Sequence, residues 1–238
     1  MLILAFDTCL DKMYVSLADG ENILTSKIVE TTKEHYHSAF LISTTRDILK
    51  EKNLMPQDIE VIATNIGPGS FTGIRACTTV ARVIAQAAEI KTIGVSSLEI
   101  LSWVKGKEVK SKMQKVKGEM ENLLLTSHLS PLTLVALDAR KEMAYMAMFE
   151  NGKEIIAPKT IPLEELKKNI KEWQPFIITD DKLLPVLGGI SYQNQDDNLG
   201  EYLIKIAYEK LKSGCETDWR KLHPLYIQPP PVTIKGKQ

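Results

Sequence analysis

Apolar runs and alternating stretches dominate the start of the chain. Leu2–Phe6 is a continuous apolar run, which is typical of a strand buried on both faces. Met13–Ala18 alternates between apolar and polar residues, and Ile23–Val29 follows after a hairpin-type turn. From about Glu34 to Lys52 the apolar spacing becomes that of a helix. The pattern therefore predicts three strands in a meander, followed by a long helix.

The residues that follow alternate between strand and helix patterns. The predicted elements are a strand at Ile59–Asn65, a helix at Phe71–Glu89, a strand at Thr92–Val95 and a helix at Ser97–Val104. With the first three strands, this order gives a meander followed by strand–helix–strand crossovers. Such an order predicts a mixed sheet with helices packed on it.

The second half repeats this order in outline. Predicted strands lie at Leu134–Leu137, Met143–Phe149, Glu154–Ala157 and Phe176–Thr179, and predicted helices at Leu163–Lys171 and Glu201–Lys212. We therefore expect an α/β protein of two lobes, each with a mixed sheet, in which the second lobe is reduced. The expected ranges are 1–104 for the first lobe and 131–228 for the second.

Two segments stand apart from the lobes. Residues 105–130 begin with closely spaced lysines, and their apolar residues recur at steps of three and four, which predicts a basic amphipathic helix connecting the lobes. Its charged face is expected to be solvated, and contact with a partner or an RNA backbone is the alternative. Residues 229–238 contain three consecutive prolines and a basic end, and are predicted to be disordered.

A glycine-rich loop separates a predicted strand from the longest predicted helix. It consists of Gly67, Pro68, Gly69, Ser70, Phe71, Thr72 and Gly73, and is followed by Arg75. Gly67 and Gly69 allow positive φ and close approach, Pro68 fixes φ between them, and Ser70 or Thr72 can cap the helix. A strand, a tight turn and a helix N-terminus form a generic anion site. However, the loop lacks the lysine of a P-loop and the spacing of a dinucleotide-binding loop, so this signal is weak.

Composition narrows the possible functions. Thirty basic residues balance thirty acidic ones, which argues against a protein that grips nucleic acid by itself. Three distant cysteines without C-x-x-C spacing indicate a reducing compartment, and neither a disulfide framework nor a zinc site. The apolar start has no charged leader region, and no run approaches the ~20 residues of a membrane span. We expect a cytoplasmic protein without membrane contact.

Catalytic and metal-binding patterns are missing from the sequence. The four histidines form no H-x-x-x-H pair, so we predict no metal site. No G-x-S-x-G elbow surrounds Ser70. Asp7 is a possible general base or metal carboxylate, but an aspartate in this position commonly accepts hydrogen bonds from its own turn. Asp138, after the first strand of the second half, is its counterpart there.

The two long helices of the first lobe are apolar over wide arcs. A helix packed only on its own sheet needs an apolar arc of ~100°, and both helices exceed it. We therefore predict that they form an interface with another chain, and coverage by loops of the same chain is the alternative. The predicted interface residues are Tyr36, Phe40, Ile74, Val80, Val83 and Ala87.

Several motifs together resemble one known family. The string GPGSFTGIR in the glycine-rich loop resembles the signature of the bacterial TsaB (YeaZ) family. The opening Leu2–Cys9 resembles the family's "ILAIDTS" start, with Cys9 where serine is usual. Gly94–Glu99 resembles "GVSSLEAL", Ala136–Glu142 resembles "AIDARRGEVY", and His223–Ile227 resembles the end of the family pattern. The match is strong over the first hundred residues and weaker after them.

The resemblance implies a fold and a role. It implies the actin-like, Hsp70-type ATPase (ASKHA) fold, in which Asp7 and Thr8 form a degenerate phosphate hairpin. It also implies a non-catalytic scaffold and activator that binds the catalytic subunit TsaD during threonylcarbamoylation of adenosine-37 in tRNAs reading codons that begin with A.

Further expectations concern partners and cofactors. The resemblance implies an ATPase subunit, TsaE, as a third partner, a homodimer when the chain is alone, and only indirect or weak contact with tRNA. The chain is expected to be inactive by itself and without a cofactor of its own, with ATP or ADP and magnesium at the subunit junction of the complex. The alternatives are an ATP-dependent phosphotransferase or peptidase using Asp7 and the loop Gly67–Gly73, and a homodimeric structural protein.

Overall fold

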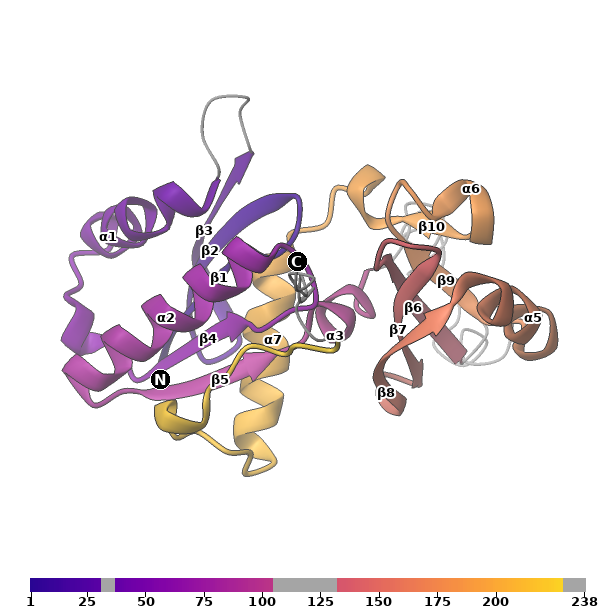
Figure 1. The fold of residues 1–238 in the computed structure, drawn as a ribbon. Coiled ribbons are helices and arrows are strands. Elements are labelled where there is room, and N and C mark those ends of the chain that lie inside the picture. Colours follow the sequence, from indigo (N-terminus) through magenta and orange to yellow (C-terminus); the bar gives the residue numbers. More distant parts are fainter. Residues whose placement is uncertain (31–36, 105–131, 229–238) are drawn as a thin grey trace, which may run out of the picture.

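The computed structural model describes residues 1–30, 37–104 and 132–228, which form two lobes (Figure 1). The predicted connecting helix at 105–130, the predicted tail at 229–238 and Tyr36 therefore lie outside the described residues. Each lobe contains a five-stranded sheet. No helix among the described residues is both long enough and apolar enough to cross a membrane.

The first sheet forms as the apolar pattern predicts. Its strands are β1 (Leu2–Asp7), β2 (Lys12–Asp19), β3 (Asn22–Glu30), β4 (Val61–Asn65) and β5 (Lys91–Val95). They lie in the order β3-β2-β1-β4-β5, with an antiparallel meander of the first three and parallel pairing of β1, β4 and β5. Because β1 and β4 are parallel neighbours, the segments that follow their carboxyl ends lie next to each other at the same end of the sheet.

The helices of the first lobe differ from the prediction at one end. They are η1 (His37–Phe40), α1 (Leu41–Glu51), η2 (Pro56–Asp58), α2 (Phe71–Ala88) and α3 (Ser97–Leu101). Residues 34–36 of the helix predicted from Glu34 lie outside the described residues. From His37 to Phe40 the chain forms a 3₁₀ turn, and α1 begins at Leu41 without a side-chain cap. By contrast, Ser70 caps α2 by accepting a hydrogen bond from the amide of Gly73, as expected.

The second sheet repeats the topology of the first. Its strands are β6 (Leu132–Asp138), β7 (Met143–Glu150), β8 (Lys153–Pro162), β9 (Phe176–Thr179) and β10 (Ile190–Ser191), in the order β10-β9-β6-β7-β8. β6 pairs antiparallel with β7 and parallel with β9, as β1 does with β2 and β4. The helices are α5 (Leu163–Trp173), α6 (Leu184–Leu187) and η3 (Tyr192–Asn194). The predicted repeat of the meander is therefore confirmed.

The last helix, α7 (Leu199–Lys212), returns to the first lobe and packs against β1, β2, β4 and β5 (Figure 1). The assignment of all of 131–228 to the second lobe is therefore wrong for α7. The physical reason is that β1 is apolar on both faces. Leu4 and Phe6 belong to the core under α1 and α2, whereas Ile3 and Ala5 on the opposite face pack into the core that contains α7.

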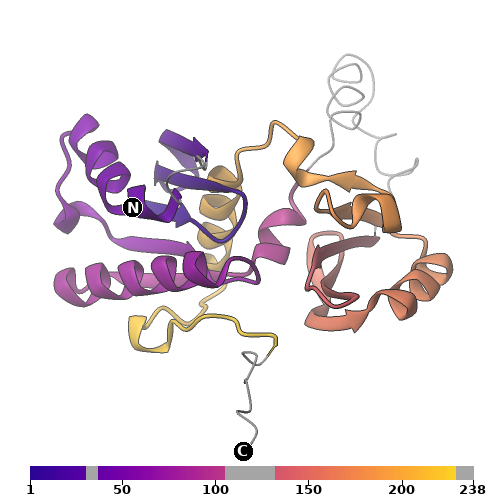
Figure 2. The ribbon, with the colours of Figure 1, turned by 45° about the horizontal axis from the view of Figure 1, so that its top comes forward.

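The segment after α7 continues along the first lobe. It contains η4 (Trp219–Lys221) and runs beside α2 in Figure 2. The amide of Thr92 on β5 donates to the Thr217 carbonyl at 2.9 Å, and Leu222 is buried in the core under α2. We call residues 213–228 the C-terminal strap.

Candidate functional site

The glycine-rich loop and the first hairpin lie against each other. The Ser70 amide donates to the carbonyl of Cys9 at 2.7 Å. The hydroxyl of Thr8 donates to the carbonyl of Gly73 at 2.8 Å. The two segments meet because they follow the neighbouring carboxyl ends of the parallel strands β1 and β4. The structure thus brings together Asp7, Thr8 and the loop, all of which the sequence singled out.

Glycine is needed at three loop positions, for positive φ at one of them and for close backbone approach at the other two. Gly67 has φ of 102°, a conformation that favours glycine. Gly69 is not among the residues with positive φ, so the positive φ expected there is wrong. Instead, a Cβ at Gly69 would lie 2.3 Å from the carbonyl oxygen of Cys9, and a Cβ at Gly73 would lie 1.8 Å from that of Thr8. Close backbone approach therefore demands glycine at both positions.

Asp7 is the centre of a buried hydrogen-bond network. Its side chain is only 1% exposed, and its two carboxylate oxygens accept from the amide of Cys9 at 2.6 Å and from Asn65 Nδ2 at 2.9 Å. Asn65 Oδ1 in turn accepts from the Gly67 amide at 2.8 Å and from Ser97 Oγ at 2.9 Å. Asp7 thus holds its own turn, as the simpler sequence interpretation predicted.

Asn65 and Ser97 were missed by the sequence reasoning. The available signal was an asparagine as the last residue of a fully buried strand, directly before the glycine turn. A polar amide in such a position requires partners, because an unpaired buried amide is costly. Ser97 lies within the motif Gly94–Glu99, but nothing in the sequence distinguishes it from the other residues of that motif.

Four amides of the hairpin and loop donate hydrogen bonds within the protein. The Thr8 amide donates to Cys77 Sγ at 3.2 Å, and the Gly73 amide donates to Ser70 Oγ at 3.3 Å. The amides of Cys9 and Gly67 are engaged by the Asp7–Asn65 network. A phosphate cradle requires amides that point at the ligand. As folded, these four amides point at protein acceptors instead.

Two buried cysteines lie beside Asp7. One ligand atom from each of Asp7, Cys9 and Cys77 lies within 4.8 Å of the others, which makes these residues a potential metal-ligand group. Spacing along the chain does not reveal the group, because Cys77 comes from α2 and the others from the end of β1. Burial raises the pKa of the Cys9 thiol well above its ordinary value, and Cys77 and Asp7 add to this shift. A raised pKa disfavours the thiolate, which is the nucleophilic form of cysteine.

The second hairpin is built around Asp138. Its carboxylate accepts from the Arg140 amide at 2.9 Å and from Lys182 Nζ at 3.0 Å, while its own amide donates to Asp180 at 2.7 Å. Burial raises the pKa of Asp138, but the hydrogen bonds from Arg140 and Lys182 together lower it below its ordinary value. A lowered pKa adds stability above the pKa of the unfolded chain, and this contribution is lost as pH falls through the folded value.

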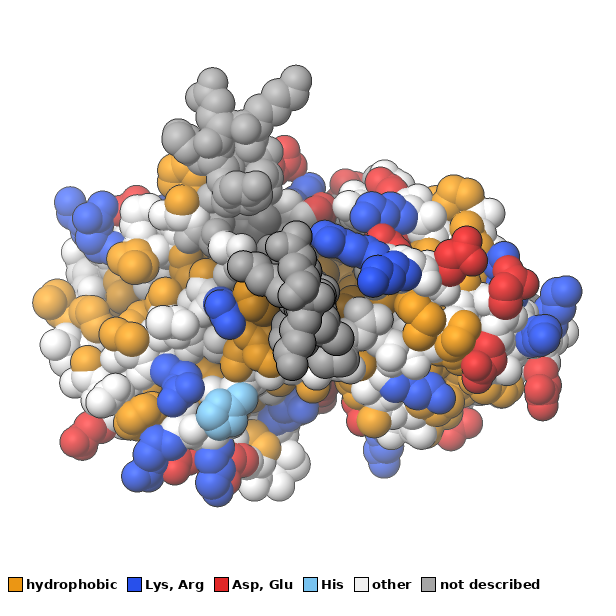
Figure 3. Space-filling model, viewed as in Figure 1, with side chains coloured by type: hydrophobic (Ala, Val, Ile, Leu, Met, Phe, Trp, Pro, Cys, Tyr) orange, Lys and Arg blue, Asp and Glu red, His pale blue; other side chains and the backbone are white. Residues whose placement is uncertain are grey.

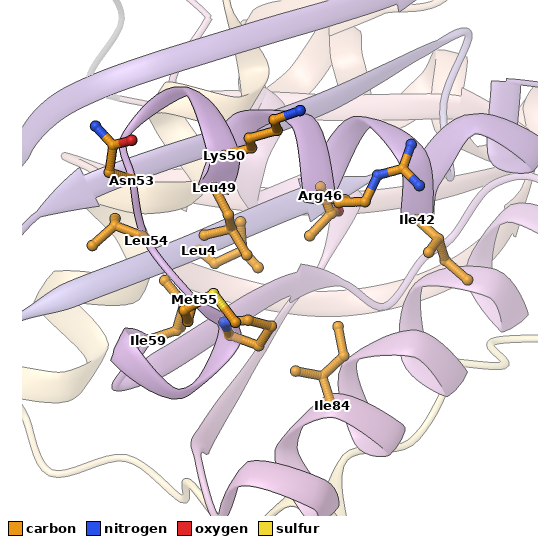
Figure 4. Close-up of a pocket in the computed structure, with 12 residues that line it drawn as sticks. Leu4, Ile42, Arg46, Leu49, Lys50, Asn53, Leu54, Met55, Ile59 and Ile84 are labelled. Carbon is orange, nitrogen blue, oxygen red and sulfur yellow. The ribbon is translucent and has the colours of Figure 1, made fainter.

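An apolar groove runs between α1 and α2. It has a volume of about 660 Å³, and Ile42 and Leu49 on α1 face Ile84 on α2 across it (Figure 4). The groove is lined by Leu4, Ile42, Thr45, Arg46, Leu49, Lys50, Asn53, Leu54, Met55, Pro56, Ile59 and Ile84. Ile42 and Met55 are 68% and 63% exposed, and apolar side chains gather on this part of the surface in Figure 3.

The predicted interface residues fall into three groups. Phe40, Val83 and Ala87 are exposed, and Val80 is partly buried. Ile74 is only 4% exposed and belongs to the core, so its assignment to the interface is wrong. The reason is the helical phase, which turns Ile74 toward the sheet. Ile42 and Met55, which are the most exposed apolar residues of the groove, were not predicted.

Arg75 lies where the C-terminal strap meets the glycine-rich loop. Its guanidinium stands 4.2 Å above the ring of Phe71, and its Nε donates to the hydroxyl of Tyr226 at 3.2 Å. The amide of Leu225 donates to the carbonyl of Ile66 at 2.7 Å. The strap therefore holds the outer side of the loop, while the Asp7 network holds its inner side.

Comparisons with known proteins decide the family. A family model described as "TsaD: tRNA N6-adenosine threonylcarbamoyltransferase" matches residues 22–171. The TsaB protein of Bacillus subtilis is 26% identical over 176 residues, covering 72% of this chain and 67% of that protein. The TsaB protein of Escherichia coli is 28% identical over 232 residues, covering 91% and 87%. The chain belongs to the TsaB (YeaZ) family. Both relatives are named as tRNA threonylcarbamoyladenosine biosynthesis proteins.

Solved structures show the TsaB fold. A Pseudomonas aeruginosa protein described as similar to the peptidase YeaZ aligns with a TM-score of 0.69 at 21% identity, covering 95% of this chain and 99% of that one. The structure described as YeaZ from P. aeruginosa aligns at 0.64 and 22% identity, covering 94% and 99%. The predicted actin-like (ASKHA) fold of two lobes is therefore confirmed.

Proposed function

We propose that this TsaB-family chain is a non-catalytic subunit that binds and activates TsaD in the threonylcarbamoylation of adenosine-37, in tRNAs reading codons that begin with A. The observation that carries the proposal is the exposed apolar groove between α1 and α2. Exposed apolar surface that is continuous over two helices is typical of a protein–protein interface. The engaged amides around Asp7 support a role without chemistry of its own.

The groove has the character of a helix-binding surface. Its floor is aliphatic, with Leu4, Leu49 and Ile84, and its rim carries the long basic side chains of Arg46 and Lys50. An amphipathic helix places apolar residues at steps of three and four into such a groove. The basic rim favours acidic residues flanking those anchors on the partner. The proposed partner surface is therefore a helix pair of TsaD or, when the chain is alone, of a second copy.

Replacing exposed apolar residues in the groove (Ile42) and next to its lining residue Ile84 on α2 (Val83) by glutamate should break the association. We expect Ile42→Glu and Val83→Glu each to weaken binding to TsaD by at least about 100-fold, because an unpaired carboxylate buried at an interface costs several kcal/mol. Both side chains are largely exposed, at 68% and 59%, so the isolated chain should fold normally. Titration calorimetry with TsaD measures the affinity, and sedimentation measures self-association.

Ile155→Glu is the matched control, because Ile155 is 51% exposed but lies on β8 in the second lobe. It should bind TsaD with unchanged affinity. Equal affinity of TsaD for the wild type and for a folded Ile42→Glu, Val83→Glu double variant would refute the proposed interface. Threonylcarbamoylation of tRNA by the reconstituted subunits should fall in parallel with binding.

The remaining parts of the proposal concern partners and location. TsaE joins the complex as a further subunit, tRNA contacts this chain only indirectly or weakly, and the complex works in the cytoplasm. The chain brings no nucleotide or catalytic cofactor of its own, and ATP or ADP with magnesium binds at the junction of the assembled subunits.

The isolated chain should neither bind nor hydrolyse ATP appreciably. The reason is that the amides of Thr8, Cys9, Gly67 and Gly73 are used by protein acceptors. Titration of ATP–Mg²⁺ into the chain should give no micromolar affinity, and ATP turnover should stay far below ~1 s⁻¹, the low end of typical enzymes. Micromolar binding that is lost in Thr72→Ala, a variant of an exposed loop residue, would instead support the phosphotransferase alternative.

A further inference from the structure

We propose that Asp7, Cys9 and Cys77 form a buried site for a thiophilic divalent cation, with Zn²⁺ as its natural occupant. The carboxylate oxygen and the two sulfur atoms lie within 4.8 Å of one another. In a tetrahedral zinc site, Zn–S bonds of about 2.3 Å and Zn–O bonds of about 2.1 Å place neighbouring ligand atoms roughly 3.5–3.8 Å apart. The observed grouping thus fits a zinc site with small side-chain movements.

The surroundings of the three ligands are those of a metal site. Cys77 Sγ accepts from the Thr8 amide at 3.2 Å, and Asp7 accepts from the Cys9 amide and from Asn65 Nδ2. Hydrogen bonds of this kind orient first-sphere ligands and stabilise their negative charge. The site is also fully enclosed, because Cys9 and Cys77 are 2% and 0% exposed.

A fourth ligand is available at the same place. The carbonyl oxygen of Asn65 lies 3.5 Å from Cys9 Sγ, on the strand next to Asp7. Binding releases the two thiol protons to solvent, and the ion then faces two thiolates, one carboxylate and one carbonyl. Two thiolates and the mixed sulfur–oxygen set favour Zn²⁺ over Mg²⁺ or Ca²⁺, which take oxygen ligands alone.

The proposed ion would connect the glycine-rich loop to the sheet. Cys77 lies one turn after Gly73 on α2, and Cys9 accepts the hydrogen bond of Ser70 through its carbonyl. A metal held by both cysteines therefore fixes α2 to the end of β1. The inference concerns stability of this edge and does not rest on the proposed binding of TsaD.

The test is to refold the full chain with one equivalent of Co²⁺ or Zn²⁺, because the enclosed site should load during folding. We expect one ion per chain by mass spectrometry, thiolate-to-cobalt charge transfer in the absorption spectrum and a higher midpoint of unfolding. Cys9→Ser and Cys77→Ser keep the hydrogen-bonding geometry and should each weaken metal affinity by at least about 100-fold. Cys215→Ser is the control and should bind as the wild type does, because Cys215 is a free cysteine outside the group.

An independent measurement does not depend on the variants folding. X-ray absorption of the zinc-loaded wild-type chain should show two sulfur and two oxygen or nitrogen neighbours. Less than a tenth of an ion per chain after refolding would overturn the proposal, where ~1 is expected for a structural site. Metal binding that survives in the Cys9→Ser, Cys77→Ser double variant, or a spectrum without sulfur neighbours, would overturn it equally.

Discussion

Gly73→Ala should cost the protein about 3 kcal/mol or more of its unfolding free energy, a loss at the upper end for an overpacked site. The new Cβ would lie 1.8 Å from the carbonyl oxygen of Thr8, 2.7 Å from its carbonyl carbon and 3.2 Å from the Cα of Cys9. All three are backbone atoms, so no side-chain rotation relieves the collision. The first turn of α2 must move away from the end of β1, which breaks the hydrogen bond from Thr8 Oγ1 to Gly73.

Chemical denaturation monitored by circular dichroism measures this loss. Gly152→Ala is the control, because Gly152 has φ of 78° but open space around its Cα. That variant should lose only about 1–2 kcal/mol, the cost of placing alanine in a left-handed conformation. A loss in Gly73→Ala that is no larger than in Gly152→Ala would mean that the loop and the hairpin are not in backbone contact.

Asn65→Ala should destabilise the protein by roughly 3–5 kcal/mol, since each buried polar group left without its partner costs about 1–3 kcal/mol. The substitution removes the donor to Asp7 and the acceptor of the Gly67 amide and Ser97 hydroxyl. All of these groups are buried, and water has no easy access to replace the lost bonds. The glycine-rich loop should then lose its inner attachment.

Thr64→Val is a suitable comparison, because Thr64 is the buried neighbour of Asn65 and its hydroxyl donates a hydrogen bond to the Phe6 carbonyl at 3.2 Å. Thr64→Val should lower the unfolding free energy by about 1 kcal/mol. Hydrogen exchange should show faster opening of the loop amides in Asn65→Ala but not in Thr64→Val. If the two variants are equally stable, the Asp7–Asn65 network is not the main support of the loop.

The strands of both lobes could be predicted because their apolar patterns are local. The pattern within Leu2–Phe6 and within Met13–Ala18 is enough to indicate a buried strand. The same kind of pattern after Leu134 indicates a second meander. The position of α7 could not be predicted in this way. An amphipathic pattern shows that Glu201–Lys212 buries one face, but not which of two sheets receives it. That choice depends on the uncovered face of the first sheet, which is a property of the folded chain.

The candidate site shows the same limit at the level of single residues. The sequence identifies Gly69 as special but does not distinguish positive φ from close approach, and only close approach holds in the structure. Ile74 and Val83 are both apolar residues of one wide helical arc, yet they are 4% and 59% exposed. Separating them requires the rotation of α2 on its sheet. The pairing of Asp7 with Asn65 likewise arises only when β1 and β4 become neighbours.

The return of α7 to the first lobe also determines when that lobe can be completed during synthesis. β1 to β5 have left the ribosome long before residues 199–212 are made, yet one face of their sheet packs against α7. Until α7 has been synthesised, it cannot cover Ile3, Ala5 and Ile93, which pack into the same core. The nascent first lobe therefore presents an apolar sheet face that chaperones can bind, and its folding is completed from both ends of the sequence.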